Sequence, residues 1–111
     1  MLMLKNIDFE SVIPLEKTVA YQKGQIVSKT IAQNDAVSLT LFAFDKGEEI
    51  STHSSSGDAM VYILDGKAQI TIDGKKYDVQ KGETIVMPAG KPHALFATEQ
   101  FKMFLIVVFP S

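Results

Sequence analysis

The two histidines are the residues of this chain that are best suited to chemistry. His53 opens a serine-rich bend, and His93 follows it forty residues later. Imidazole binds transition metals and exchanges protons near neutral pH. The 111-residue chain has no cysteine and no arginine, which excludes thiolate metal sites and guanidinium clamps for phosphate or carboxylate. A reactive or metal-binding site in this protein therefore depends on whether the two imidazole rings lie close together.

Short apolar runs separated by turn residues predict the elements that position these histidines. The Asp-Gly pairs at 65–66 and 73–74 predict hairpins, because both central residues of such turns need positive φ. Only residues 8–15 could hold a helical turn, and Pro14 limits it. Strands are expected over 26–31, 37–44, 59–64, 68–72, 75–79, 84–88, 93–97 and 101–109. This pattern in a chain of this length predicts one all-β domain, a sandwich or a barrel.

The spacing of glycine, proline and histidine repeats a known pattern. The first segment reads Gly47, five residues, His53, and continues to Gly66. The second reads Gly82, five residues, Pro88, one residue, Gly90, two residues, His93. Together they resemble the two signature motifs of the cupin superfamily.

This resemblance implies a fold and a division of the chain. Small cupins are single-domain jelly-roll β-barrels made of two antiparallel sheets. We therefore expect one domain over residues 1–111, with a core barrel at 36–109. The N-terminal segment 1–35 would add strands or dimer contacts.

The resemblance also implies a metal centre of three histidines and one carboxylate. Here Ser55 stands at the second-histidine position and Ala59 at the carboxylate position, so His53 and His93 are two ligands of four. Zinc and iron centres usually have at least three protein ligands. We expect a divalent transition metal (Zn, Fe, Ni or Mn) to be held weakly or not at all. The alternative is a pair of histidines hydrogen-bonded to each other, to water or to a ligand.

Asp58 is the nearest carboxylate that could replace the missing ligand. Strand alternation sends it to the face opposite Ala59, so only a bulge near Gly57 would turn it inward. Otherwise its carboxylate bonds nearby backbone amides. We expect the pocket around the histidines to be mainly apolar. Met60 or Met87 could also contribute to its wall. The residues expected to line it are Ser55, Asp58, Ala59, Val61, Ile63, Val86 and Leu95.

The sequence leaves three functions open, and with them the question of whether the protein is an enzyme. The first is a metal-dependent dioxygenase, isomerase or decarboxylase that acts on a small acid, phenol or sugar derivative through His53 and His93. Without metal, either histidine could act as a general base. The second is a non-catalytic module that binds a small molecule. The third is a dimerisation scaffold.

The amino-acid composition restricts the kinds of partner that this protein could bind. The net charge is −2, and the chain has neither arginine nor tryptophan, which argues against nucleic-acid binding. No apolar run is long enough to span a membrane and no leader is recognisable, so a cytoplasmic location is expected. The run 103–109 is apolar on both faces. Either a second layer of the fold covers it or a second subunit does, and a homodimer is favoured.

Overall fold

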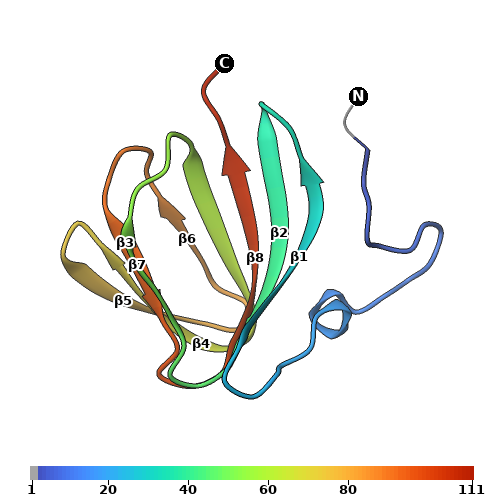
Figure 1. The fold of residues 1–111 in the computed structure, drawn as a ribbon, viewed down its shortest axis with the longest axis horizontal. Coiled ribbons are helices and arrows are strands. Elements are labelled where there is room, and N and C mark those ends of the chain that lie inside the picture. Colours follow the sequence, from blue (N-terminus) through green and yellow to red (C-terminus); the bar gives the residue numbers. More distant parts are fainter. Residues whose placement is uncertain (1–2) are drawn as a thin grey trace.

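Eight strands build the fold of residues 3–111, which are the residues that the computed structural model describes. A 3-10 helix, η1 (Leu15–Thr18), precedes them (Figure 1). The strands are β1 (Ile26–Gln33), β2 (Val37–Phe44), β3 (Glu49–His53), β4 (Asp58–Ile72), β5 (Lys75–Gln80), β6 (Thr84–Met87), β7 (His93–Phe96) and β8 (Phe101–Val108). Residues 1–2 of the expected N-terminal segment lie outside the described residues.

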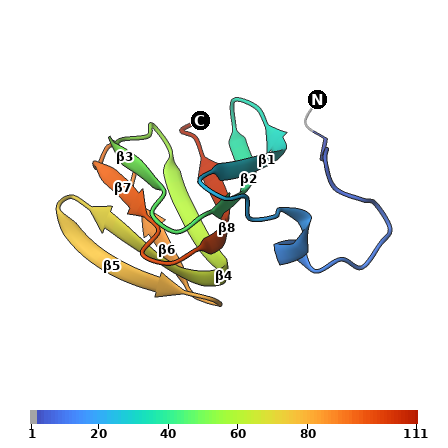
Figure 2. The same ribbon diagram turned by 60° about the horizontal axis from the view of Figure 1, so that its bottom comes forward.

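The strands form two antiparallel sheets that share β4 (Figure 2). The first sheet contains β1, β2, β8, the N-terminal half of β4, and β6. The second sheet contains β3, β7, the C-terminal half of β4, and β5. The predicted all-β jelly-roll β-barrel with two antiparallel sheets is therefore confirmed, and both histidines belong to the second sheet.

Strand β4 differs from the sequence prediction at Asp65-Gly66. The predicted hairpin there is wrong, because β4 continues through both residues, which pair with Lys102 and Phe101 of β8. Gly66 has a φ of +73°, and the register shifts between Ile63 and Asp65. The pair therefore bends one long strand where it passes from the first sheet to the second.

The second Asp-Gly pair forms the predicted hairpin. Asp73 and Gly74 have φ values of 50° and 82°. Ile72 and Lys75 on either side are partners in the β4–β5 ladder. Two central residues with positive φ are what the turn of a tight two-residue hairpin requires.

The helical turn also lies elsewhere than predicted. It begins at Leu15, the last residue of the predicted range 8–15, directly after Pro14, and ends at Thr18. Pro14 is extended at the N-cap with a ψ of 115°. Proline disfavours the helical region for the residue before it, so the helix starts only beyond the ring.

The first sheet carries an apolar layer on each face, because β8 and the C-terminal half of β2 are apolar on both faces. Inside the barrel, Phe44 and Phe101 stack with ring centroids 4.4 Å apart. On the outer face, Leu41 packs in a second cluster with Val19 of the N-terminal segment and with Phe104 of β8. Part of the outer face of β8 is thus covered by this chain itself.

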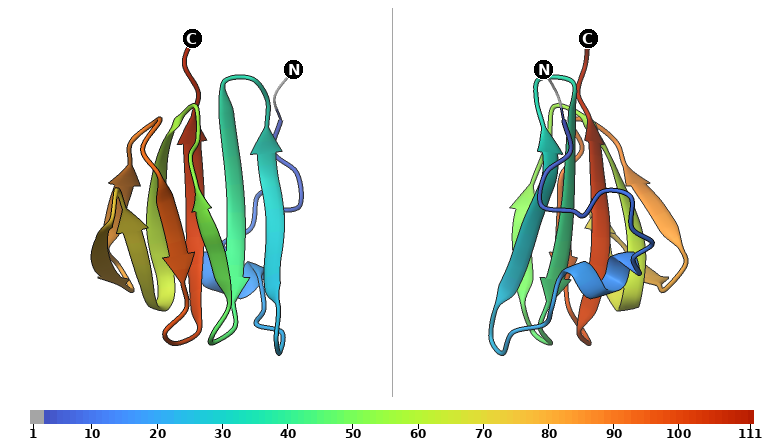
Figure 3. Two further views of the ribbon diagram at one scale, coloured as in Figure 1. Left: turned by 60° about the vertical axis from the view of Figure 1, so that its left-hand side comes forward. Right: turned by 90° about the vertical axis from the view of Figure 1, so that its right-hand side faces the viewer.

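Polar contacts fix the N-terminal segment on that face. The Tyr21 hydroxyl donates to Asp65 Oδ2, and Lys102 Nζ donates to the carbonyl oxygen of Glu16 at 2.7 Å. Burial, and after it the hydrogen bond to Asp65, hold the pKa of Tyr21 well above its usual value. The segment runs across β1, β2 and β8 (Figure 3, right).

Residues 3–111 contain no helix with the length and apolar character needed to cross a membrane.

Candidate functional site

The two histidine rings meet across neighbouring strands. His53 at the end of β3 pairs with His93 at the start of β7. Their Nε2 atoms are 3.1 Å apart, and the rings meet edge to face with centroids 4.3 Å apart. The structure thus brings together the two residues that the motif spacing predicts to converge.

A backbone contact of His53 indicates which nitrogen of its ring carries hydrogen, and the contact between the rings then indicates the same for His93. Nδ1 of His53 lies 2.9 Å from the carbonyl oxygen of Ser51. A carbonyl oxygen only accepts, so this nitrogen is the donor and Nε2 of His53 is left as an acceptor. Nε2 of His93 must then donate to it. The pair therefore presents one N–H donor and one lone pair, side by side.

His93 is the buried member of the pair. It is 3% exposed, whereas His53 is exposed. Burial, and after it the charge of His53, hold the pKa of His93 below its usual value near 6.5, and the backbone at Lys91 opposes this shift. Nδ1 of His93 has no hydrogen-bond partner although it is buried. His93 is therefore favoured in its neutral form.

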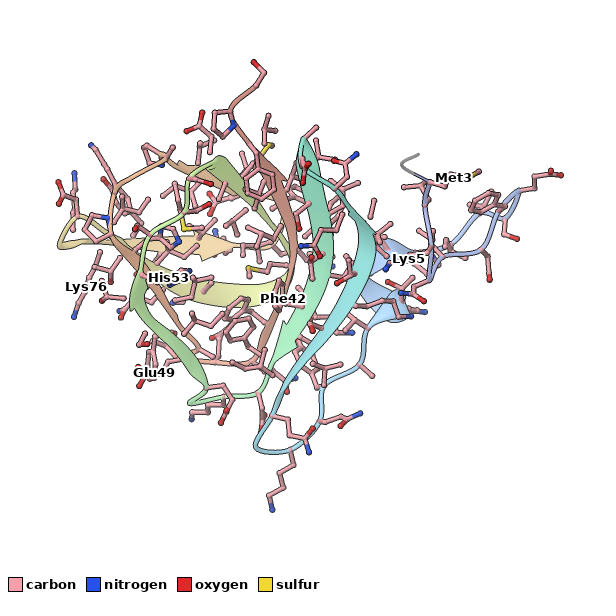
Figure 4. All side chains as sticks on the ribbon, turned by 45° about the horizontal axis from the view of Figure 1, so that its top comes forward. Met3, Lys5, Phe42, Glu49, His53 and Lys76 are labelled. Carbon is pink, nitrogen blue, oxygen red and sulfur yellow. The ribbon has the colours of Figure 1, made fainter. Side chains whose placement is uncertain are left out.

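A cavity of about 310 Å³ adjoins the two rings inside the barrel. Its lining contains no lysine, aspartate or glutamate, so it is apolar and uncharged apart from the histidines and two serines. In Figure 4, Phe42 points into the interior near His53, while Glu49 lies at the outer edge. The lining residues are Phe42, Ile50, His53, Ser54, Ser55, Ala59, Met87, His93, Leu95, Met103, Leu105 and Val107.

Three of the residues expected in the pocket line the cavity beside the histidines. Ser55, Ala59 and Leu95 are among its walls. Val61 and Ile63 face the interior as expected, but they are fully buried in the packed core and do not line the cavity. The expected pocket therefore included two residues of β4 that the cavity does not reach.

Two other expected residues lie outside the pocket. Val86 is 51% exposed, because it pairs with Met60 on the outer face of the first sheet while Met87 points inward. Asp58 is exposed, and its Oδ1 accepts a hydrogen bond of 2.9 Å from the backbone N–H of Ala89. Placing Val86 and Asp58 in the pocket was wrong. The alternative for Asp58 is correct in that its carboxylate bonds a backbone amide, but this amide belongs to Ala89, 31 residues away, and not to a local turn.

Sequence reasoning missed the far wall of the cavity. Met103, Leu105 and Val107 project from β8, and Phe42 and Ile50 come from β2 and β3. Alternation along β8 assigns these three residues to one face and their sequence neighbours to the other. Because both faces of the strand are apolar, the sequence does not show which face points inward. Only the packing of the second sheet decides this.

The separation of the two Nε2 atoms is that of neighbouring ligands of one metal ion. Two nitrogens bound to a zinc ion at 2.0–2.1 Å lie about 3.0–3.4 Å apart, and the Nε2 atoms are 3.1 Å apart. No third ligand joins them, since residues 3–111 contain no cluster of three or more His, Asp or Glu side chains that could hold an ion. Ser55 Oγ, at the second-histidine position, accepts a hydrogen bond from Gly57 N–H. The donor set does not fit an ion held by the protein alone.

Comparison with known proteins agrees with this architecture. The family model described as a cupin domain matches residues 40–109. A conserved protein of unknown function from Streptococcus pyogenes is 50% identical, covers 97% of this chain and 95% of its own, and superposes with a TM-score of 0.95. A cupin superfamily protein from Desulfitobacterium hafniense is 35% identical over 97% of this chain and 99% of its own, with a TM-score of 0.93.

A relative of known activity is more distant. Quercetin 2,3-dioxygenase from Bacillus subtilis is 27% identical over 74 residues, which are 66% of this chain and 22% of the enzyme. An uncharacterized protein from Methanocaldococcus jannaschii is 38% identical over 40 residues, and the match spans 32% of its length. The matched stretch therefore spans a minor part of each of these two curated relatives.

The family model spans more than half of the chain, and a solved relative with half of its residues identical superposes over almost the whole length. The chain therefore belongs to the cupin domain family.

Proposed function

We propose that this protein binds a small, mainly apolar molecule that carries one hydroxyl group, and that the two histidines hold the hydroxyl without a metal ion. The observation that carries the proposal is the donor–acceptor pair formed by His93 and His53 at the wall of an apolar cavity. Family membership supports a small-molecule site of this kind but names no ligand.

A hydroxyl group complements both members of the pair. Its oxygen accepts from the Nε2–H of His93, and its hydrogen is donated to Nε2 of His53. An inserted hydroxyl would replace the 3.1 Å contact between the rings with two hydrogen bonds. A carboxylate only accepts, so it would match one ring and leave the other without a partner.

The cavity walls restrict the rest of the ligand. With about 30 Å³ for each water-sized group, a cavity of about 310 Å³ holds on the order of ten non-hydrogen atoms. Burying further hydroxyl groups against Leu95, Leu105 and Val107 would leave them without partners, which is unfavourable. Phenols and small alcohols therefore fit better than sugars or organic anions.

A thermal-shift screen in the presence of a chelator tests this proposal. Phenols and apolar alcohols are expected to raise the Tm, and sugars of similar size are not. A ligand at a hundred times its Kd stabilises the folded protein by about 2.7 kcal/mol. The same screen on His53→Ala is expected to lose the shift, because His53 is exposed and its removal takes away the acceptor without disturbing the core.

Asp58→Asn is the matched control. Its side chain lies outside the cavity, and an amide oxygen can still accept from the backbone N–H of Ala89. It should bind the same ligands as the unmodified protein. Loss of binding in Asp58→Asn with retention in His53→Ala would overturn the proposal.

A second candidate is a metalloenzyme of the dioxygenase or decarboxylase type. The 3.1 Å separation of the Nε2 atoms and the similarity to quercetin 2,3-dioxygenase favour it. The missing third ligand argues against it. Elemental analysis of the purified protein separates the two candidates. Stoichiometric transition metal that disappears in His53→Ala and His93→Ala would favour the enzyme.

A further inference from the structure

The polar side chains of the cavity wall lie together at one end of the cavity. They are the two histidines, Ser54 and Ser55, which come from the end of β3, the loop that follows it and the start of β7. The other residues that line the cavity are apolar. Ser54 is exposed, whereas Ser55 is half-buried. Ser55 is therefore the hydroxyl group near the histidine pair that solvent reaches less freely.

Two hydrogen bonds fix the loop that carries Ser55 to the turn before His93. The carbonyl oxygen of Ser55 accepts from the backbone N–H of Gly90 at 2.9 Å. Asp58 Oδ1 accepts from the neighbouring N–H of Ala89, also at 2.9 Å. Because Gly90 and His93 belong to the same short segment between β6 and β7, these bonds position Ser55 relative to His93. Asp58 thus supports the cavity wall from outside the cavity.

The side chain of Ser55 is also held in place. Its Oγ accepts a hydrogen bond of 3.1 Å from the N–H of Gly57. Gly57 is buried against β8, where a Cβ would clash with the carbonyl oxygen of Val108, so the position of this N–H is fixed. Among residues 3–111, the hydrogen of the Ser55 hydroxyl has no acceptor. A hydroxyl that already accepts a hydrogen bond is a stronger donor, and this donor remains free for a ligand.

We infer that Ser55 determines which ligands this pocket prefers, and that the preferred ligand is a phenol with an acceptor oxygen on the ring carbon next to its hydroxyl. The inference rests on the proposed function, in which the histidine pair holds the hydroxyl. The Ser55 O–H donates to the second oxygen, which is an alkoxy or carbonyl oxygen with a free lone pair. Both oxygens of the ligand then lie at the polar end of the cavity.

The apolar walls disfavour a second oxygen elsewhere on the ring. With the hydroxyl at the histidine pair, an oxygen on the far side of the ring would face the apolar residues that line the rest of the cavity, among them Phe42 (Figure 4), Met103 and Leu105. Burying an oxygen there without a donor is unfavourable. The cavity volume of about 310 Å³ is sufficient for a benzene ring with a hydroxyl and a methoxy group.

Two isomeric ligands measure this preference. 2-Methoxyphenol and 4-methoxyphenol contain the same atoms and differ only in where the second oxygen lies. Isothermal titration calorimetry with a chelator present gives the Kd of each isomer. The unmodified protein is expected to bind 2-methoxyphenol about tenfold more tightly. In Ser55→Ala this ratio is expected to fall by about threefold or more, because the donor is lost. A loosened loop alone would weaken the binding of both isomers and leave their ratio unchanged.

Ser56→Ala is the matched control, since Ser56 lies in the same loop, is exposed and does not line the cavity. It should keep the ratio of the unmodified protein. Equal Kd values of the two isomers, or a ratio that Ser55→Ala does not change, would overturn the role of Ser55 and leave the proposed function intact. If phenol and both isomers fail to bind the unmodified protein, the proposed function and this inference are both wrong.

Discussion

His53 and His93 share one hydrogen bond but lie in different surroundings, and the sequence predicted one part of this arrangement. The motif spacing placed both rings at the ends of paired strands, and they converge there. It placed Val86 in the pocket and named Met87 only as a further candidate, whereas Val86 faces out and Met87 faces the cavity. Alternation divides a strand into two faces, but only tertiary packing decides which one is inside.

The low pKa of His93 predicts a specific dependence of stability on pH. In the folded protein His93 binds its proton less readily than in the unfolded chain, because burial disfavours the charged ring. The unfolded chain therefore takes up more protons as the pH falls below about 6.5, its ordinary value. This contribution to stability is complete above that pH and is lost below it.

Urea unfolding from pH 7.5 down to pH 5.5, with a chelator present, measures this effect. The free energy of unfolding of the unmodified protein is expected to fall over this range, and that of His93→Gln to fall less steeply because glutamine does not titrate. Parallel curves for the two proteins would show that His93 ionises as easily in the fold as in the unfolded chain.

At the scale of elements, the same dipeptide has two different structures. Asp73-Gly74 turns between β4 and β5, whereas Asp65-Gly66 bends β4 without ending it. Both glycines have positive φ, so the local sequence could not distinguish them. The difference lies in a distant segment, since the backbone at Gln100 and Phe101 packs directly against Gly66. The positions of the strands could be predicted from the local sequence pattern. The continuation of β4 through Asp65-Gly66 could not.

Alanine substitutions separate the two roles. A Cβ at Gly66 would clash with the carbonyl oxygen of Gln100, while a Cβ at Gly74 meets nothing within 4 Å. Gly74→Ala is expected to lower the free energy of unfolding by about 1–2 kcal/mol, the cost of a left-handed alanine. Gly66→Ala must also displace the backbone before β8, so a loss of about 3 kcal/mol or more is expected. Denaturant titration measures both, and equal losses would contradict the role given to Gly66.

At the scale of the whole molecule, one sheet separates two apolar layers with different uses. Inside, the layer contains the cavity and the histidine pair. Outside, the N-terminal segment covers part of the layer and leaves Met60, Tyr62 and Val86 exposed. The two-faced composition of β8 predicted that both faces would be covered. How much of the outer face this chain covers itself could not be predicted, because it depends on where the N-terminal segment is fixed.

The nitrogen resonances of the two histidines test the central claim most directly. The chain has only these two histidines, so a long-range ¹H–¹⁵N spectrum at pH 7.5 with a chelator needs only His53→Gln for assignment. We predict that His53 is protonated at Nδ1 and His93 at Nε2, and that a phenol which raises the Tm shifts both Nε2 resonances. The same tautomer in both rings, or a bound phenol that leaves both Nε2 resonances unchanged, would contradict the account.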